Sequence, residues 1–118
     1  MTEPQIVRVW SSRIRSCDEQ DYSDYIRTTG LEDYRQTPGN LGAQMLMRPS
    51  GDGTTEVTTL SWWSSMEALI AFAGPRPEVA RYYPEDDRFL LERPLHVAHH
   101  RIVQHAVPAA SSSEGARA

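Results

Sequence analysis

Residues 41–63 read LGAQMLMRPSGDGTTEVTTLSWW, and this stretch decides the fold. Its middle, Pro49-Ser50-Gly51-Asp52-Gly53, consists of turn-forming residues and separates two segments rich in apolar and β-branched side chains. We therefore predict an antiparallel hairpin whose strands cover Leu41–Arg48 and Thr54–Trp63, joined by a somewhat long loop.

On the N-terminal side of the hairpin, the spacing of apolar residues indicates a strand and then a helix. Alternation predicts a first strand over Gln5–Ile14. An acidic first turn followed by apolar residues at helical spacing predicts a helix from Asp18 to Gly30. A short helical turn over Leu31–Arg35 leads to the breaker Pro38-Gly39-Asn40.

On the C-terminal side, the same criteria indicate a second helix and a last strand. Ser64 or Ser65 can cap a helix over residues 66–73, where apolar side chains recur every three or four residues. We predict a further helical turn over 78–83 and an irregular segment over 84–94. The last strand runs from His96 to about Gln104.

The resulting order, βαββαβ, is that of an α+β ferredoxin-like fold with an antiparallel sheet and both helices on one face. Three strands carry apolar residues at both parities, which indicates that the other face is also buried: Ile6, Val7, Val9, Met45, Leu46, Met47, Val97, Ala98, Ile102 and Val103. Packing two such sheets across a two-fold axis predicts a homodimer in the form of a dimeric α+β barrel. We expect one domain over residues 1–106 and a disordered tail over 107–118.

Composition excludes several classes of function. The chain has 118 residues and a net charge of -4, and all twelve of its basic residues are Arg. The absence of Lys excludes Schiff-base chemistry and a phosphate-loop lysine, and the lack of a basic run makes nucleic acid an unsuitable partner. No apolar run is long enough for a membrane span and no secretory signal is visible, so we expect a soluble cytoplasmic protein. Cys17 is the single cysteine, which excludes an internal disulfide.

A set of short motifs resembles the antibiotic biosynthesis monooxygenase family over roughly residues 5 to 104. The matching positions are Thr29-Gly30-Leu31 with Tyr34, Thr37-Pro38-Gly39-Asn40-Leu41-Gly42, Trp63 with Ser65 and Glu67-Ala68, Phe72-Ala73-Gly74, Tyr82-Tyr83-Pro84-Glu85-Asp86-Asp87 with Phe89-Leu90, and His99. The resemblance implies a dimeric α+β barrel with a substrate pocket between the helices and the sheet. Some family members oxidise aromatic polyketide intermediates with molecular oxygen and no metal or flavin, and others degrade haem.

Two departures from the family pattern restrict the activity. Members that use oxygen without a cofactor, and the haem degraders, commonly place an Asn on the first strand, whereas the only Asn here is Asn40. The haem degraders also carry a ligand His on the second helix, where this chain has Phe72 and Ala73. Haem cleavage is accordingly disfavoured.

Two residues stand out as candidates for chemistry. The resemblance implies that Trp63 is a pocket wall that stacks on an aromatic substrate; the alternative is an aromatic core or dimer-interface residue. His99 is the candidate general base that removes a phenolic proton, against the alternative of a satisfied, partly buried histidine. We predict that Trp63 and His99 border one pocket.

Further candidates bind the substrate. Arg8 and Trp10 share one parity on the first strand, and both are candidates to bind the substrate. Arg8 can pair with an enolate or carboxylate, although a salt bridge to Asp86 or Glu56 is an alternative. Phenolic hydrogen bonds at a pocket rim can come from tyrosines, among them Tyr22 and Tyr82. The acidic segment around Asp86 is interpreted as a lid or as a solvated helix cap.

All four histidines lie between His96 and His105, but alternation along a strand points them to opposite faces, so we expect no bound metal. No dinucleotide or phosphate fingerprint is present, and we expect neither flavin nor haem. The leading hypothesis is a cofactor-independent monooxygenase or oxidase that acts on a small aromatic or polyketide-like molecule. The alternatives are a non-oxidative cyclase or isomerase, and a ligand- or haem-binding barrel without turnover.

Overall fold

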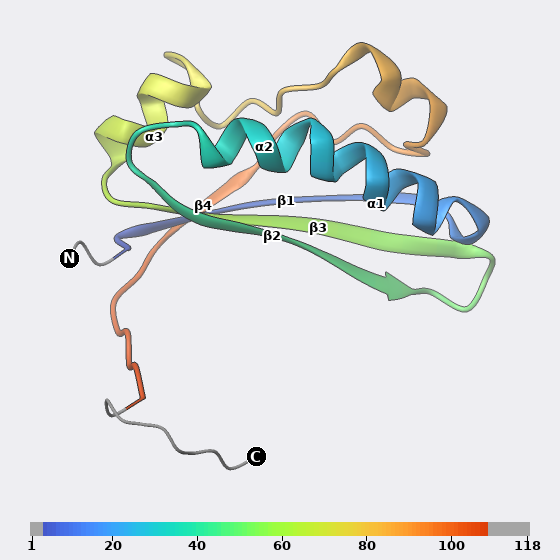
Figure 1. The fold of residues 1–118 in the computed structure, drawn as a ribbon, viewed down its shortest axis with the longest axis horizontal. Coiled ribbons are helices and arrows are strands. Elements are labelled where there is room, and N and C mark those ends of the chain that lie inside the picture. Colours follow the sequence, from blue (N-terminus) through green and yellow to red (C-terminus); the bar gives the residue numbers. More distant parts are fainter. Residues whose placement is uncertain (1–3, 109–118) are drawn as a thin grey trace.

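The computed structural model describes residues 4–108 and confirms the α+β ferredoxin-like fold. Helices cover one face of a four-stranded antiparallel sheet with the order β2-β3-β1-β4 (Figure 1). The elements are β1 (Ile6–Arg15), the 3-10 turn η1 (Ser16–Asp18), α1 (Glu19–Thr28), α2 (Gly30–Arg35), β2 (Asn40–Pro49), β3 (Thr54–Trp63), α3 (Met66–Ala73), the 3-10 helix η2 (Pro84–Arg88) and β4 (Ala98–Arg101). Within the described residues, no helix combines the length and apolar character that a membrane span requires.

The pairing of β1 with β3 forms the centre of the sheet. It is antiparallel and unbroken from the pair Ile6 and Trp63 to the pair Arg15 and Thr54. Because side chains alternate along a strand, this register sends one set of residues toward the helices. Two buried apolar clusters result, one around Ile14 and Val57 under α1, the other around Ile6, Trp63 and Leu69 under α3.

The helix-facing side of the sheet also buries polar residues. They are Arg8, Ser12, Thr55, Thr59 and Ser61. Most of them bond to side chains or backbone: the Trp63 indole donates to Ser61 Oγ at 2.9 Å, and Ser12 Oγ donates to the Glu92 carbonyl at 2.6 Å. Such partners are required, since a buried polar group without a hydrogen bond is destabilising.

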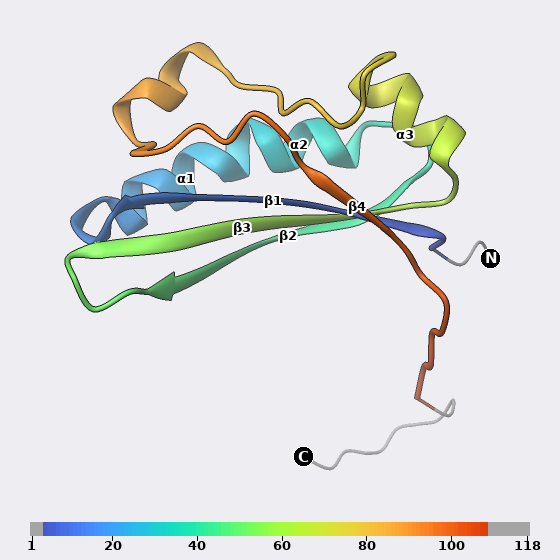
Figure 2. The ribbon, with the colours of Figure 1, turned by 180° about the vertical axis from the view of Figure 1, so that it is seen from behind.

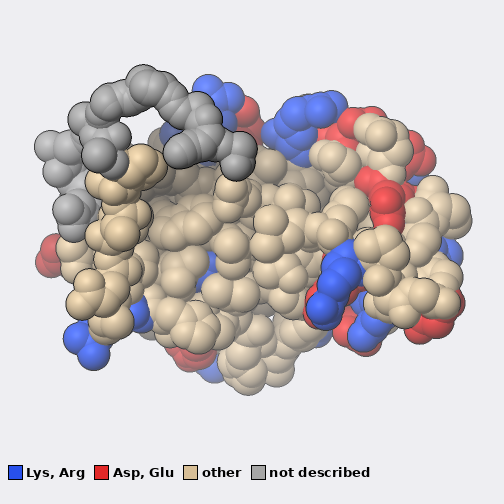
Figure 3. Space-filling model, turned by 90° about the horizontal axis from the view of Figure 1, so that it is seen from below, with Lys and Arg blue, Asp and Glu red and all other residues tan. Residues whose placement is uncertain are grey.

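The opposite side of the sheet carries Val7, Val9, Leu46, Leu60 and Trp62, which the register places out of phase with the buried set. Figure 3, which views this side, shows a surface formed mostly by uncharged side chains. Apolar residues therefore lie on both faces of the sheet, as the parity of the strands indicates.

A long connection from α3 to β4 crosses the helical side of the sheet. Figure 2 shows this connection from behind. The predicted helical turn over residues 78–83 is wrong. Val79 forms a bridge with His96, and the Ala80 N–H donates to the Leu95 carbonyl at 2.9 Å. These antiparallel bonds satisfy backbone groups that a helical turn would otherwise pair within itself.

The last strand is shorter than predicted. β4 ends at Arg101, and one further bond joins the Ile102 N–H to the Gln5 carbonyl. Since β1 begins at Ile6, the chain beyond this point has no strand to pair with. Residues 107 and 108 are exposed and outside any element, and the rest of the predicted tail lies outside the described residues.

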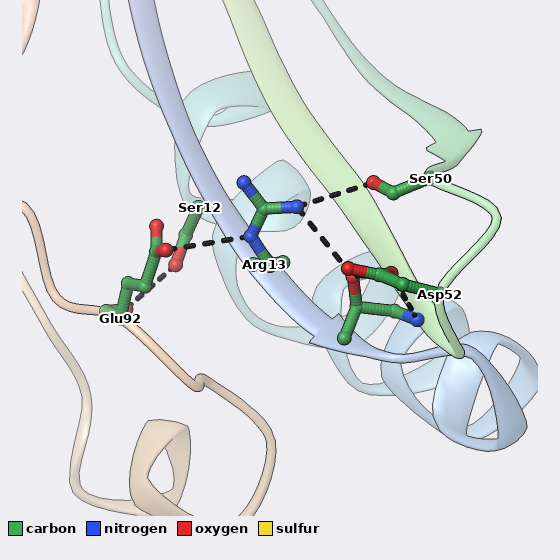
Figure 4. A network of polar contacts seen from close by, with 6 residues as sticks. Ser12, Arg13, Ser50, Asp52 and Glu92 are labelled. Atoms are coloured by element: carbon green, nitrogen blue, oxygen red, sulfur yellow. Dashed lines mark hydrogen bonds and ion pairs between the residues drawn. The ribbon is translucent and has the colours of Figure 1, made fainter.

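A polar network fixes the segment after η2 against the end of β1 (Figure 4). The Arg13 guanidinium donates to the Glu92 carboxylate through Nε at 3.3 Å and to Ser50 Oγ through Nη1 at 3.1 Å. The Leu91 N–H donates to the Arg13 carbonyl. The network thereby holds the connection, including η2, over the helical side of the sheet.

Gly39 allows α3 to pack closely on the turn before β2. Its φ is +86°, a conformation that favours glycine, and a Cβ at this position would overlap the Cβ of Ala68. The Ser64 N–H donates to the Gly39 carbonyl at 2.9 Å, so the same turn holds the start of α3.

We expect Gly39→Ala to destabilise the protein more than Gly51→Ala. Both glycines have a φ of +86°, but nothing lies within 4 Å of a Cβ built on Gly51. The shared backbone strain costs about 1–2 kcal/mol, and the overlap with Ala68 adds roughly 1–3 kcal/mol for Gly39 alone. Urea unfolding of both variants measures the difference, and equal free energies of unfolding would contradict the packing role of Gly39.

Candidate functional site

A cavity lies between the helices, the central strands and the connection that contains η2. It offers about 70 Å³ to the centres of water-sized molecules. Six of its thirteen lining residues are aromatic, two carry guanidinium groups and one carries a carboxylate: Arg8, Trp10, Tyr22, Ile26, Gly30, Leu31, Tyr34, Thr59, Phe72, Arg81, Tyr82, Tyr83 and Asp86. Aromatic walls with a few polar groups are typical of small-molecule sites.

One helical stripe forms a wall of this cavity. Tyr22, Ile26, Gly30 and Tyr34 follow one another at intervals of four residues across α1 and α2. Residues four apart lie on the same face of a helix, so the stripe faces the sheet. The predicted site contained Tyr22 but not Tyr34, although this spacing was visible in the sequence.

A second wall consists of stacked aromatic rings at the α3 end. Phe72 lies 5.1 Å from Tyr34 and 5.2 Å from Trp63, measured between ring centroids. The Arg81 guanidinium lies 4.8 Å above the Phe72 ring. Trp63 is fully buried and does not line the cavity, so it supports Phe72 and Tyr34 from behind. The sequence prediction omitted Phe72 and Arg81 from the site.

Trp10 and Tyr82 form the wall nearest the long connection. The Trp10 indole donates to Tyr82 Oη at 3.1 Å, and Tyr82 Oη donates to the Pro94 carbonyl at 2.5 Å. Burial is the main cause that raises the pKa of the Tyr82 phenol above its ordinary value. This phenol therefore stays protonated at neutral pH and acts as a hydrogen-bond donor.

Asp86 is a buried carboxylate at the start of η2. Its Oδ2 accepts the Tyr83 N–H at 2.6 Å, and its Oδ1 accepts the Tyr25 hydroxyl at 3.0 Å. The first bond is that of a helix cap, but Asp86 is 4% exposed, so the cap is buried and not the solvated one that the sequence suggested. Burial, followed by the charge of Asp86, raises the pKa of the Tyr22 phenol. Asp86 is the single carboxylate among the described residues that line the cavity.

Arg8 is 4% exposed and makes none of the predicted salt bridges. Its Nη1 donates to the Pro77 carbonyl at 2.7 Å and approaches His99 Nε2 at 3.0 Å. Asp86 instead pairs with tyrosines, and Glu56 pairs with Arg48 at 2.8 Å across the hairpin. Within residues 4–108, no carboxylate forms an ion pair with Arg8. Burial lowers its pKa from the ordinary 12.5 while Tyr34 opposes this, and a guanidinium remains charged.

His99 reaches the cavity only through Arg8. The strand register pairs the two residues, and His99 is not among the lining residues. Because a guanidinium only donates, Nε2 of His99 must accept, which assigns a neutral imidazole with its proton on Nδ1. Burial first, and the charge of Arg8 second, lower the pKa of His99 below its ordinary 6.5. His99 and Trp63 therefore do not border the cavity, whereas Arg8, Trp10, Tyr22, Tyr82 and Asp86 do.

We expect His99→Gln to weaken the loss of stability at acid pH. The folded state lowers the pKa of His99, so below about 6.5 the unfolded state binds the proton more readily and stability falls as the pH falls. Gln keeps an acceptor for Arg8 but does not titrate. The measurement is the drop in Tm between about pH 7.5 and about 5.5. The control, His100→Gln, changes the next residue along β4, which faces away from the helices; an equal effect of both variants would contradict the assignment.

No protein-family model matches the chain, and no curated protein matches it. Solved structures do. A Bacillus cereus protein assigned to the antibiotic biosynthesis monooxygenases is 13% identical with a TM-score of 0.62, and the match covers 90% of this chain and 100% of that one. The chain has the fold of the antibiotic biosynthesis monooxygenases. The α+β ferredoxin-like fold implied by the sequence motifs is thereby confirmed, and the dimeric barrel stays a prediction.

Two further solved structures share this fold. One is a Streptomyces coelicolor monooxygenase from the gene ActVA-Orf6 in complex with nanaomycin D; it is 18% identical with a TM-score of 0.57, and the match covers 90% of this chain and 94% of that one. The other is a heme-degrading protein of Mycobacterium tuberculosis, 17% identical with a TM-score of 0.56, and the match covers 86% and 98%. At these sequence identities the comparison establishes the fold and does not establish the reaction.

Proposed function

We propose that the protein is a monooxygenase or oxidase that oxidises a small phenolic or polyketide-like aromatic molecule with molecular oxygen and without a bound cofactor. The observation that carries the proposal is the cavity, which combines aromatic walls with a buried cation and a buried carboxylate. Its presence in a fold shared with a nanaomycin-binding monooxygenase supports the assignment.

The dimensions of the cavity favour a small substrate. Space of about 70 Å³ for the centres of water-sized molecules is far too small for a porphyrin, and the cavity would have to widen to admit even one aromatic ring. Phe72 and Trp10 offer ring faces, and the Tyr82 hydroxyl offers a polar contact beside them. These features favour the oxidation of a phenol over the degradation of haem.

Asp86 is our candidate proton acceptor. Asp86 is the one carboxylate of the described lining, whose other polar side chains are phenols, guanidinium groups, an indole and a hydroxyl. Each carboxylate oxygen accepts one hydrogen bond in the structure and has capacity for another. His99 keeps a role, but as a positioning residue that holds Arg8, since its Nε2 already faces the guanidinium. Trp63 packs behind Phe72 and so supports the wall on which the substrate's aromatic ring would lie.

In the proposed reaction the substrate itself supplies the electrons that reduce molecular oxygen. Removing the phenolic proton gives an electron-rich anion that reacts with oxygen at a ring carbon and forms a carbon–oxygen bond. The oxygen–oxygen bond then breaks, one atom stays in the product as a quinone carbonyl, and the other leaves as water with two hydrogens of the substrate. A dihydroxynaphthalene with one hydroxyl on each ring thus gives a hydroxynaphthoquinone.

We expect the protein to consume one oxygen molecule for each dihydroxynaphthalene oxidised and to incorporate labelled oxygen into the quinone. Asp86→Asn should lower turnover by about 100-fold or more, and raising the pH until the substrate ionises by itself should restore much of the rate. Glu85→Gln is the matched control because Glu85 is the exposed neighbour in η2. An oxygen electrode and mass spectrometry measure both effects, with circular dichroism to check folding.

Two outcomes would overturn the proposal. Substrate conversion without oxygen consumption would identify a cyclase or isomerase. Tight binding of aromatic molecules without any conversion would identify a binding protein. If instead Asp86→Asn kept full activity while wild-type protein consumed oxygen, the reaction would stand and the assignment of the base would fail.

We further propose that two copies pack through the outer faces of their sheets. Leu46 is 45% exposed on this face, and Val7, Val9, Leu60 and Trp62 lie beside it in the register. An apolar sheet face of this kind favours burial against a second copy across a two-fold axis.

We expect Leu60→Arg to convert a dimer into a monomer at micromolar concentration, because it places a charge in the middle of the proposed interface. The control is Leu95→Arg, which adds the same charge at a residue that is 68% exposed and outside the sheet. Multi-angle light scattering measures the mass. A wild-type monomer, or a Leu60→Arg dimer, would contradict this interface.

A further inference from the structure

The guanidinium of Arg8 carries a charge that the described part of the chain does not neutralise. It is buried at the cavity, its hydrogen bonds to Pro77 and His99 both use Nη1, and it forms no ion pair with a carboxylate of residues 4–108. A buried charge is costly unless it is paired. A lining charge of this kind is therefore suited to an anionic ligand.

The anchored nitrogen determines how such a ligand can bind. The bonds to Pro77 and His99 both use Nη1, and Tyr34 is a further side-chain hydrogen-bond partner, so an anionic ligand meets the guanidinium beside Tyr34. The Nε–H and Nη2–H bonds point in the same direction from the planar group. Two parallel donors match the two oxygens of a carboxylate, which gives a short, charge-assisted bidentate pair. Holding the guanidinium beforehand also lowers the entropy lost on binding.

The second charged group gives the ligand a direction. Asp86 lines the same cavity but makes no ion pair with Arg8, and its oxygens accept bonds from Tyr25 and Tyr83. An acid group would be repelled by Asp86 and attracted by Arg8. A phenolic hydroxyl, by contrast, can donate to Asp86.

We propose that the substrate is a hydroxylated aromatic carboxylic acid, bound through its carboxylate by the Nε–Nη2 edge of Arg8 and through its phenol near Asp86. This inference names the substrate class of the site and rests on the proposed function. His99 is a positioning residue in it, since it fixes the guanidinium without contacting the ligand. Arg81, exposed at the cavity and stacked on Phe72, supplies a screened positive charge of smaller effect.

The test is calorimetric titration of the full chain at neutral pH with para-hydroxybenzoate and, in parallel, para-hydroxybenzamide, which has the same shape and no charge. We expect the acid to bind at least about tenfold more tightly, because hydrogen bonds to charged groups are the stronger ones. Arg8→Gln should remove this preference, because it weakens binding of the acid far more than binding of the amide, whose carbonyl accepts a weaker bond from the guanidinium. Arg81→Gln should weaken binding of the acid less than about fivefold, as expected for an exposed charge.

Several results would overturn the proposal. Equal affinities of wild-type protein for the acid and the amide would do so without any variant, which keeps the test decisive even if Arg8→Gln does not fold. A larger loss in Arg81→Gln than in Arg8→Gln would move recognition to the rim. Because binding is measured without turnover and the oxygen assay uses an uncharged phenol, failure of this inference is distinguishable from failure of the proposed oxidation.

Discussion

The unbroken pairing of β1 with β3 is the constraint on which the rest of the structure depends. It places Arg8 opposite Ser61 and Trp10 opposite Thr59, so that polar and apolar side chains share the side of the sheet that the helices cover. A shift by one residue would send every one of these side chains to the other face. These two strands contribute Arg8, Trp10 and Thr59 to the lining of the cavity.

Each end of the helical layer covers an apolar cluster. Ile14, Val57 and Phe89 belong to a buried apolar cluster at one end, and Ile6, Trp63 and Leu69 form another. The cavity is lined by Tyr22 of the first cluster and by Tyr34 and Phe72, which pack against the second. Packing on both sides holds these rings in place, and such support is what a site needs to orient a substrate.

Charge gives the cavity its chemical character. Arg8 and Asp86 have opposite signs and line the same space, yet each bonds to neutral partners instead of to the other. Their charges thus remain directed at whatever molecule enters. The neutral form of His99 is part of this arrangement, because its Nε2 accepts a hydrogen bond from Arg8. A protonated imidazole would instead repel the guanidinium.

The sequence by itself determined the order of the strands and helices, because alternation and helical spacing follow directly from backbone geometry. It also indicated five residues that the structure brings to one cavity: Arg8, Trp10, Tyr22, Tyr82 and Asp86. Only the tertiary structure decided that Trp63 lies behind the wall and that His99 faces Arg8, because both depend on which side chain fills the space between distant segments. The path of residues 74–97 was likewise a tertiary outcome, since its backbone bonds pair Val79 with His96.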